Sequence, residues 1–420
     1  MTKPTLESIL KNLPPETQEV IRAMWQGVPA DQRGDLTALL RYVPKDPGSL
    51  RTLLDLSKNQ IRQAFGRKHS VAIIGPTNTG KSTLYNQFVQ DKGEKALVSP
   101  VPGTTRVPSQ ADAGLFAVVD TPGADAVGAA GETERQLALD AAAAADILVI
   151  LFDAVQGIKQ TELDLFDQLA ALDKPYIVAL NKIDLVRRER SEVVRQVAGT
   201  LGLETEQVIP ISAKNGENLG ALVTGIAVAE PALVSALGQA LPQYRWQLAW
   251  RSIISSASIA AAIALTPLPV IDFAPLVITQ SVMVLGIARI YDYQITLERA
   301  RELVVTFGLG FIGRMLFAQL SKLGGVPGWL LASAVASSLT VAMGVAAAVW
   351  FERGERLSRE TLSRLTRELT GQLLDTLKSL GSRRPTRKTL RERIETALEE
   401  TDLGKELPGA QLPDGTAGKP

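Results

Sequence analysis

The stretch VAIIGPTNTGKSTLYNQF, residues 71–88, decides the fold of the central part of this chain. The apolar run at residues 71–74 predicts a buried strand, and the segment STLYNQF predicts a helix. Between them lies a loop that begins at Gly75 and reaches Gly80 before the helix starts. Backbone N–H groups of such a loop, at the positive end of a helix, surround phosphate oxygens. The stretch therefore predicts a strand, loop and helix unit that binds a nucleoside triphosphate.

Four further motifs follow this loop. They are PGTTR at 102–106, DTPG at 120–123, NKID at 181–184 and SAK at 212–214. Apolar strand patterns alternate with helical patterns here, which favours a parallel sheet with helices on both faces. The predicted strands are residues 71–74, 115–119, 147–152, 176–180 and 208–211. Every motif except PGTTR comes just after a strand, at the edge where parallel sheets bind ligands.

The loop and the first turn of its helix are expected to hold the phosphates. Lys81 would reach the outer phosphates and take part in catalysis, while the Ser82 hydroxyl would bind Mg²⁺. Asp120 would hold the same ion, and the Gly123 N–H would register whether the terminal phosphate is present. The expected phosphate-binding residues are Gly75, Pro76, Thr77, Asn78, Thr79, Gly80, Lys81, Ser82 and Thr83.

The NKID motif predicts which base the site binds. The Asp184 carboxylate can accept two hydrogen bonds from guanine, from N1–H and from the exocyclic amine. Adenine offers no such pair of donors, so a site of this kind discriminates by about 10⁴ or more. Asn181 and the stem of Lys182 would shape the loop and cover the ring. The SAK residues, Ser212, Ala213 and Lys214, complete the expected base site, in which Ala213 N–H would meet the guanine oxygen.

Length and composition limit the remaining choices. The chain has 420 residues, which suggests two or three domains. Its net charge of +1 gives no global reason to expect a nucleic acid partner. It has no cysteine, which excludes disulfides and thiolate metal sites. The N-terminus lacks the apolar run of a secretory signal, so an intracellular protein with a cytosolic nucleotide domain is expected.

Changes in composition predict five regions. Residues 1–69 are a helical N-terminal region, and residues 70–230 are the nucleotide domain. Residues 242–351 form an apolar helical domain, and residues 352–400 form charged amphipathic helices. The tail at 401–420, rich in Gly, Pro and charge, is expected to be disordered.

Two readings remain open for residues 242–351. Between 252 and 288 the only charged residue is Asp272, and between 323 and 351 there is none, so helices of membrane length are possible. TPLPVIDFAP, residues 266–275, predicts a turn between two helices, and an amphipathic helix follows at about 297–323. Basic segments after Phe351 fit a cytosolic return of the chain. Abundant Ala and Ser equally fit a soluble bundle or a hairpin buried in an oligomer.

With all five motifs in place, residues 70–230 resemble the translation-factor-related GTPases that include Era, EngA and TrmE. The PGTTR segment resembles their effector loop, which implies that Thr105, with Thr104 as the less favoured choice, closes on Mg²⁺ in the GTP state. The resemblance implies GTP hydrolysis to GDP with Mg²⁺. It also implies a change in the two switch loops that flanking helices can sense.

Two departures from Ras-like proteins concern catalysis. Ala124 stands where those proteins carry the glutamine that orients water, so slow intrinsic hydrolysis is expected. Asn78 matches the TrmE-group asparagine that helps to hold K⁺ beside the phosphates. One hypothesis is that K⁺, held by Asn78 and by loop carbonyls, supplies the missing charge when two such domains meet as a homodimer. The other is that Asn78 only stabilises the loop.

ALTPLPVIDFAPLV, residues 264–277, and the apolar helix after it resemble a bacterial domain of unknown function found after GTPase domains and in YcjF-like membrane proteins. This resemblance implies lipid contact and a position at the inner membrane. The expected protein is thus a GTP switch coupled to a membrane-associated helical domain, with an unknown protein effector. The alternatives are a dynamin-like membrane scaffold and a ribosome or RNA assembly factor, although no basic, aromatic-interleaved RNA module follows residue 230.

Overall fold

The computed structural model describes a defined part of the chain. The described residues are 18, 22, 47–66, 70–88, 109–110, 115–120, 129–265, 274–293, 300–301, 327–355, 357–381 and 384–408. The chain divides into two compact units. One is Lys68–Tyr244, and the other combines Met1–Arg67 with Arg245–Pro420. The first unit is therefore inserted in sequence between two segments of the second.

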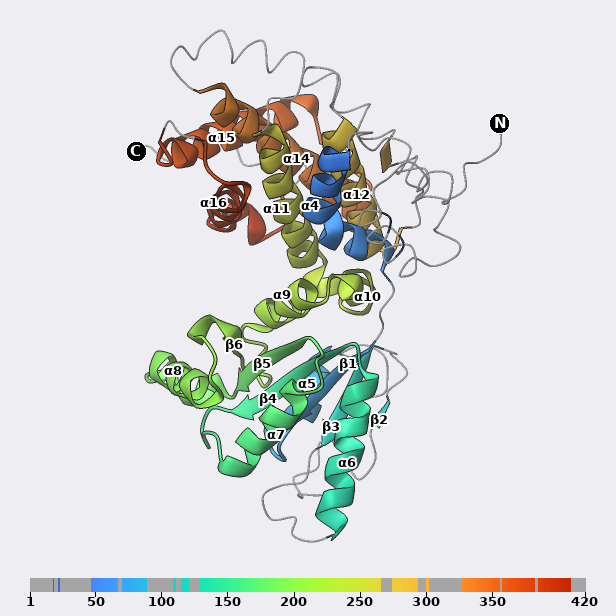
Figure 1. Ribbon diagram of the computed structural model, residues 1–420, viewed down its shortest axis with the longest axis vertical. Helices are drawn as coiled ribbons and strands as arrows, with labels where there is room; N and C mark the ends of the chain where they lie inside the picture. Colours follow the sequence, from blue (N-terminus) through green and yellow to red (C-terminus); the bar gives the residue numbers. More distant parts are fainter. Residues whose placement is uncertain are drawn as a thin grey trace, which may run out of the picture. The chain divides into compact units, whose positions relative to one another are not determined.

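A six-stranded sheet forms the centre of the Lys68–Tyr244 unit, in the order β2-β3-β1-β4-β5-β6 (Figure 1). Its strands are β1 (Val71–Gly75), β2 (Ser109–Gln110), β3 (Phe116–Asp120), β4 (Ile147–Asp153), β5 (Tyr176–Asn181) and β6 (Val208–Pro210). All neighbouring strands pair in parallel except β2, which runs antiparallel to β3. The predicted α/β fold with a parallel-type sheet is thus confirmed.

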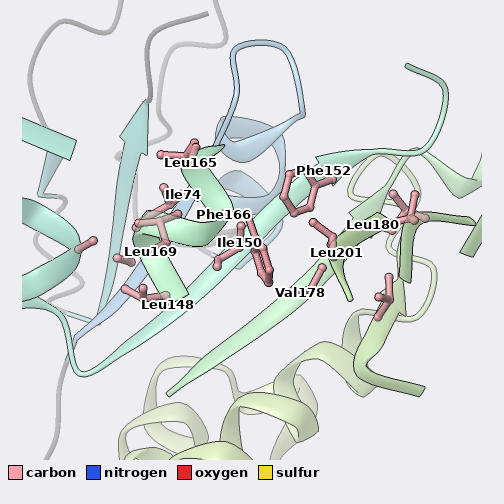
Figure 2. Packing of buried hydrophobic residues seen from close by; sticks show 14 of the residues in the cluster. Ile74, Leu148, Ile150, Phe152, Leu165, Phe166, Leu169, Val178, Leu180 and Leu201 are labelled. Atoms are coloured by element: carbon pink, nitrogen blue, oxygen red, sulfur yellow. The ribbon is translucent and has the colours of Figure 1, made fainter. Parts of the chain in front are cut away.

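One face of the sheet carries the main apolar cluster of this unit. Three helices contribute to it: α6 (Ala129–Ala144), α7 (Gln160–Ala170) and α8 (Arg190–Leu201). Figure 2 shows side chains from β1, β4 and β5 meeting those of α7 and α8. Because successive strand residues point to opposite faces, Leu148, Ile150 and Phe152 of β4 all enter this cluster.

The opposite face is covered by α5 (Lys81–Phe88) and α9 (Leu219–Ala229). Phe88 of α5 stacks on Phe116 of β3, with ring centroids 4.9 Å apart. At Gly225 of α9, an added Cβ would lie under 3.0 Å from Ile209. A glycine there lets the helix pack close to the sheet. Short helices follow: η4 (Pro231–Leu233), α10 (Val234–Ala240) and η5 (Pro242–Tyr244).

The other unit is helical in its described part. Its helices are α4 (Pro47–Phe65), α11 (Arg245–Ala264), α12 (Ala274–Ile290), α14 (Gly328–Arg353), α15 (Arg359–Lys378) and α16 (Arg387–Glu399). Helix α14 packs against α11, α12 and α15, while α16 packs on α11. The N-terminal helix α4 packs on α12 and α11. Segments that are distant in sequence therefore share one core.

Small residues bring α14 close to α11. The Ser333 and Ser337 hydroxyls donate to the carbonyls of Ala261 and Ala257 on α11, at 3.2 and 2.9 Å. Further along α14, an added Cβ at Gly344 would lie under 3.0 Å from the side chain of Ile253. The Ala and Ser content of these helices thus permits direct contacts between the two helices.

Helices α15 and α16 are amphipathic and capped. Ser358 and Thr386 accept the N–H groups of Thr361 and Thr389, both at 3.1 Å, which satisfies donors that a helix start leaves unpaired. The amphipathic character expected for residues 352–400 is seen in α15 as a buried apolar face, formed by Leu365, Leu369, Leu373, Leu374 and Leu377. Leu362 of the same helix is half-buried.

Among the described residues, α14 is the one single helix that is long and apolar enough to cross a membrane, and most of it is buried within the protein. Helix α12 is also apolar, but it is shorter than α14. The turn at 266–273, with Asp272, lies outside the described residues, as does most of the helix expected at 297–323. The tail beyond residue 408 also lies outside them.

Candidate nucleotide site

Four residues, three of them from the motifs, end neighbouring strands at the same edge of the sheet. Gly75, the last residue of β1, pairs in register with Asp120 of β3. On the other side, Asp153 of β4 pairs with Asn181 of β5. Since β3, β1, β4 and β5 are parallel neighbours, the segments that follow them leave the sheet on one side. Strand order alone thus brings the phosphate loop, the DTPG motif and the NKID motif together.

The phosphate loop has two residues with left-handed backbone. Asn78 has φ 67° and is exposed, and Gly80 has φ 94°. Thr79 closes the loop from within, because its hydroxyl donates to the Pro76 carbonyl at 2.9 Å. Thr77, which lies between Pro76 and Asn78 in the loop, is half-buried. A Cβ at position 80 would lie under 3.0 Å from the Asn181 amide nitrogen, so the loop path requires glycine there.

Lys81 begins α5 and is almost fully buried, with 3% of its surface exposed. Its ammonium donates to the Gly75 carbonyl at 2.7 Å and to the Pro76 carbonyl at 2.6 Å. These bonds keep a positive charge at the helix start, where the helix dipole is also positive. Ser82 and Thr83 follow in the first turn and are half-buried. This end of α5 suits an anionic ligand.

Asn181 joins three of the motifs. Its side-chain N–H donates to the Thr79 carbonyl of the phosphate loop at 2.7 Å. Its side-chain oxygen accepts the Ala213 N–H at 2.8 Å. The side chain is 3% exposed, so both bonds are shielded from water. The Ala213 N–H, expected to meet the guanine oxygen, is used by Asn181 in this structure.

Asp184 and Ser212 connect the NKID and SAK motifs. The Ser212 hydroxyl donates to the Asp184 carboxylate at 2.7 Å, which holds the half-buried carboxylate in place. Ser212 is itself fixed, because its N–H donates to the Glu217 carbonyl at 3.0 Å. Lys214 is exposed, and its carbonyl accepts the Gln87 amide of α5 at 3.5 Å.

Sequence reasoning missed Asp153. This carboxylate is 5% exposed and forms an ion pair with Lys182 of NKID, with 2.6 Å between Asp153 Oδ2 and Lys182 Nζ. The signal was available, since an acidic residue directly follows the apolar run at 147–152, at the same strand end as NKID. It was overlooked because it belongs to none of the five motifs.

Several expected site residues lie outside the described part. Thr104, Thr105, Gly123 and Ala124 are in this group, and for Asp120 only the backbone is described. Within the described residues, no group of three or more His, Cys, Asp or Glu side chains could hold a metal ion. The Mg²⁺ site expected here uses hydroxyls of Ser82 and Thr105 with one carboxylate. Hard oxygen donors of this kind fit Mg²⁺.

Two family models match successive parts of the chain. Residues 70–182 match the family described as 50S ribosome-binding GTPase. Residues 231–375 match a domain of unknown function, DUF697. The first match covers the phosphate loop and the strands that end at the site. The second begins after the sheet, runs through α14 and ends within α15.

Curated relatives of this chain include GTPases named Der. The protein of Syntrophobacter fumaroxidans is 35% identical over 167 residues, which cover 38% of this chain and 36% of the relative. The protein of Solidesulfovibrio magneticus is 35% identical over 164 residues, or 37% of this chain and 35% of the relative. The chain thus spans about a third of the length of these relatives.

Solved structures also match part of this chain. Aquifex aeolicus Era bound to GDP.AlF4⁻ is 25% identical, with a TM-score of 0.34, and covers 46% of this chain and 68% of its own. A probable GTP-binding protein, engB, is 25% identical with a TM-score of 0.32, and covers 39% and 98%. By the family and sequence matches, this chain contains a GTPase domain that is similar in sequence to Der, followed by a helical domain of unknown function.

Proposed function

We propose that this protein hydrolyses GTP to GDP with Mg²⁺ and acts as a nucleotide-dependent switch. The observation that supports it most is the Asn181 network, which ties the phosphate loop to both base-reading loops at one strand edge. A single ligand that has both phosphates and a base would contact all three loops. Residues 75–83 would then hold the phosphates. The residues proposed to hold the base are Asn181, Lys182, Asp184, Ser212, Ala213 and Lys214.

In this proposal Lys81 stabilises the outer phosphates and their developing charge. Its two bonds to loop carbonyls hold the ammonium where the triphosphate would lie. Ser82, Thr105 and Asp120 would hold Mg²⁺, which neutralises phosphate charge when bound. Gly123 would donate its N–H to the terminal phosphate. With Ala124 in place of a water-orienting glutamine, turnover by the isolated protein would be slow.

The test is GTP turnover by the full-length protein, measured as phosphate release with and without Mg²⁺. Lys81→Ala is expected to lower kcat about a hundredfold, because one charge-stabilising donor is lost from the transition state. Lys174→Ala is the matched control. Lys174 is a half-buried lysine of the same unit whose ammonium also donates to a backbone carbonyl, that of Ala145, at 3.0 Å. Equal turnover by wild-type and Lys81→Ala protein would exclude this site as the source of hydrolysis.

Activation by K⁺ is a further part of this proposal. Asn78 is exposed and has a left-handed backbone, so its side chain is accessible from solvent and would be available to a cation. Replacement of Na⁺ by K⁺ is expected to raise turnover, more so at concentrations that favour dimers. Asn78→Gly keeps the left-handed backbone without strain and removes the amide. This variant should hydrolyse GTP without a K⁺ response, and a retained response would contradict a role for Asn78.

The helical unit is proposed to couple the switch to a membrane. The specific observation is α14, whose length and composition suit a span. Its burial against α11, α12 and α15 favours the alternative of a soluble bundle. Flotation with liposomes of anionic bacterial lipids decides between them. Co-flotation with faster turnover supports coupling to the membrane, whereas protein that stays soluble without detergent and remains at the bottom supports the bundle.

Two further functions are distinguished by simple measurements. A dynamin-like scaffold would show turnover per molecule that rises steeply with protein concentration, because assembly completes its site. Ribosome assembly is the second function, and it is based on the description 50S ribosome-binding of the family that residues 70–182 match. That function would give nucleotide-dependent co-sedimentation with 50S subunits, and its absence would leave the membrane-coupled switch as the proposal.

A further inference from the structure

Asp153 is a buried carboxylate at the base-binding end of the sheet. It is the last residue of β4 and stands directly beside Asn181, the first residue of NKID. Only 5% of its surface is exposed. A buried carboxylate is costly unless it is paired and hydrogen-bonded, so its partners indicate why it is there.

Both carboxylate oxygens of Asp153 are engaged. Oδ1 accepts the N–H of Val155 at 2.8 Å, which shapes the turn after β4. Oδ2 accepts the ammonium of Lys182 at 2.6 Å and the amide of Gln156 at 3.4 Å. The bond to Lys182 is charge-assisted and is the shortest of the three. The turn after β4 is thereby linked to the second residue of the base-reading motif.

Lys182 determines the geometry of the residues that follow it. Its φ is 67° and its ψ is 29°, a left-handed conformation that is unfavourable for a residue with a side chain. It is the N-cap of η2 (Ile183–Leu185), and its carbonyl accepts the Leu185 N–H at 3.0 Å. Asp184 lies inside this turn. The orientation of the guanine-reading carboxylate therefore depends on the conformation of Lys182.

We propose that Asp153 is a positioning residue for base recognition: it holds Lys182 so that the following turn presents Asp184 to guanine. This inference rests on the proposed function of guanine-nucleotide binding. Asp153 itself touches no nucleotide in this arrangement. Its contribution is to anchor the left-handed lysine through an ion pair whose carboxylate is buried. The Ser212 hydroxyl also holds the Asp184 carboxylate, through a separate hydrogen bond.

The test compares binding of GDP and IDP, which differ by the exocyclic amine that Asp184 would accept. In Asp153→Asn the amide oxygen can still accept the Val155 N–H, but the charge that holds Lys182 is lost. GDP affinity is expected to fall about tenfold, since groups within one network couple by about 1.4 kcal/mol. IDP affinity should fall less, so the GDP to IDP preference shrinks.

A second variant keeps the test valid if Asp153→Asn folds poorly. Lys182→Met removes the ammonium and retains an aliphatic stem over the base, and the lysine side chain is already 30% exposed. It should lose the same preference. The double variant should lose no more than the larger single loss, because both changes break one interaction. Glu192→Gln breaks an exposed ion pair with Arg195 on α8 and should leave both affinities unchanged.

The outcomes separate the two levels of the proposal. If wild-type protein binds GDP and IDP equally, both the proposed guanine site and the positioning role are wrong. If wild-type protein prefers GDP and Asp153→Asn keeps the full preference, only the positioning role is wrong. A lower melting temperature without a change in preference would assign Asp153 to the stability of the sheet and would also contradict the inference.

Discussion

Gly80 is the position in the phosphate loop where a side chain is least tolerable. Its φ is 94°, and a Cβ would lie under 3.0 Å from the Asn181 amide that supports the Thr79 carbonyl. We predict that Gly80→Ala weakens GDP binding at least about tenfold, because the clash and the backbone strain together displace Asn181. Binding of a fluorescent GDP derivative to the full-length variant measures the effect.

Gly157 provides a matched control for this prediction. It also has a positive φ, 67°, but nothing lies within 4 Å of the position of its Cβ. Gly157→Ala therefore has a similar backbone strain without the clash, and it should keep wild-type GDP affinity with a small loss of stability. Equal losses in the two variants would show that strain alone, and not the contact with Asn181, limits position 80.

Ser212 is predicted to matter through one hydroxyl. Ser212→Ala removes the donor to Asp184 at 2.7 Å and leaves the Ser212 backbone bond to Glu217 intact. Loss of a hydrogen bond to a charged group costs about 1.5–3 kcal/mol, which corresponds to more than a tenfold loss of GDP affinity. Titration calorimetry tests this. Thr200→Ala, which removes an exposed hydroxyl bond on α8, should bind as wild type does.

At the scale of elements, burial decided what the sequence could predict. The parallel strands were predictable because β1 and β4 are buried on both faces and read as continuous apolar runs. β2 was not, because Ser109–Gln110 is too short to have a pattern. On α4, the polar residues Ser57, Gln60 and Gln63 are buried, against the usual preference for exposure. Tertiary packing, which no local pattern encodes, explains these misses.

The candidate site was predictable in its motifs but not in the network between them. Each of the five motifs was identified from its own residues. The bonds from Asn181 to Thr79 and Ala213 join residues more than thirty positions apart, so only the folded sheet reveals them. Asp153 was missed for the same reason, since its importance comes from a partner on the neighbouring strand. Spacing in the sequence does not report contacts across strands.

Two helical glycines give opposite predictions for the same substitution. Gly344 of α14 faces Ile253 of α11 so closely that a Cβ would lie under 3.0 Å from it. Gly344→Ala should destabilise the helical unit by about 1–3 kcal/mol, because buried Ile253 cannot move away. Gly371 of α15 is exposed and has open space at its Cβ. Gly371→Ala should stabilise by about 0.8–1.0 kcal/mol through helix propensity.

Urea unfolding followed by tryptophan fluorescence measures both variants. All five tryptophans of the chain lie outside residues 68–244, at positions 25, 246, 250, 329 and 350, so this signal reports the helical unit. No loss of stability in Gly344→Ala would mean that close packing of α11 on α14 is not what fixes this unit, and a loss in Gly371→Ala would contradict the prediction from helix propensity.

At the scale of the whole molecule, the nucleotide unit interrupts the helical unit in sequence. In the sequence, α4 comes first and the unit Lys68–Tyr244 follows it. Helices α11 and α12, on which α4 packs, come after that unit. The helical core is therefore completed by residues on both sides of the insertion. Each unit nevertheless has its own apolar core, so changes in one core should be separable from ligand binding by the other.

Phe65, the last residue of α4, tests this separation. It is fully buried, and the Arg289 guanidinium of α12 lies 5.3 Å from its ring centroid. Phe65→Ala should destabilise the helical unit by about 3–5 kcal/mol, which tryptophan fluorescence records, and should leave GDP affinity unchanged at temperatures where both units are folded.

Leu169→Ala is the corresponding variant of the nucleotide unit, because Leu169 lies in the buried apolar cluster on one face of the sheet. It should lower the unfolding temperature reported by bound fluorescent GDP and spare the tryptophan transition. If both variants shift both signals equally, the two units unfold as one cooperative body, and the helical unit would then be a structural requirement of the nucleotide site.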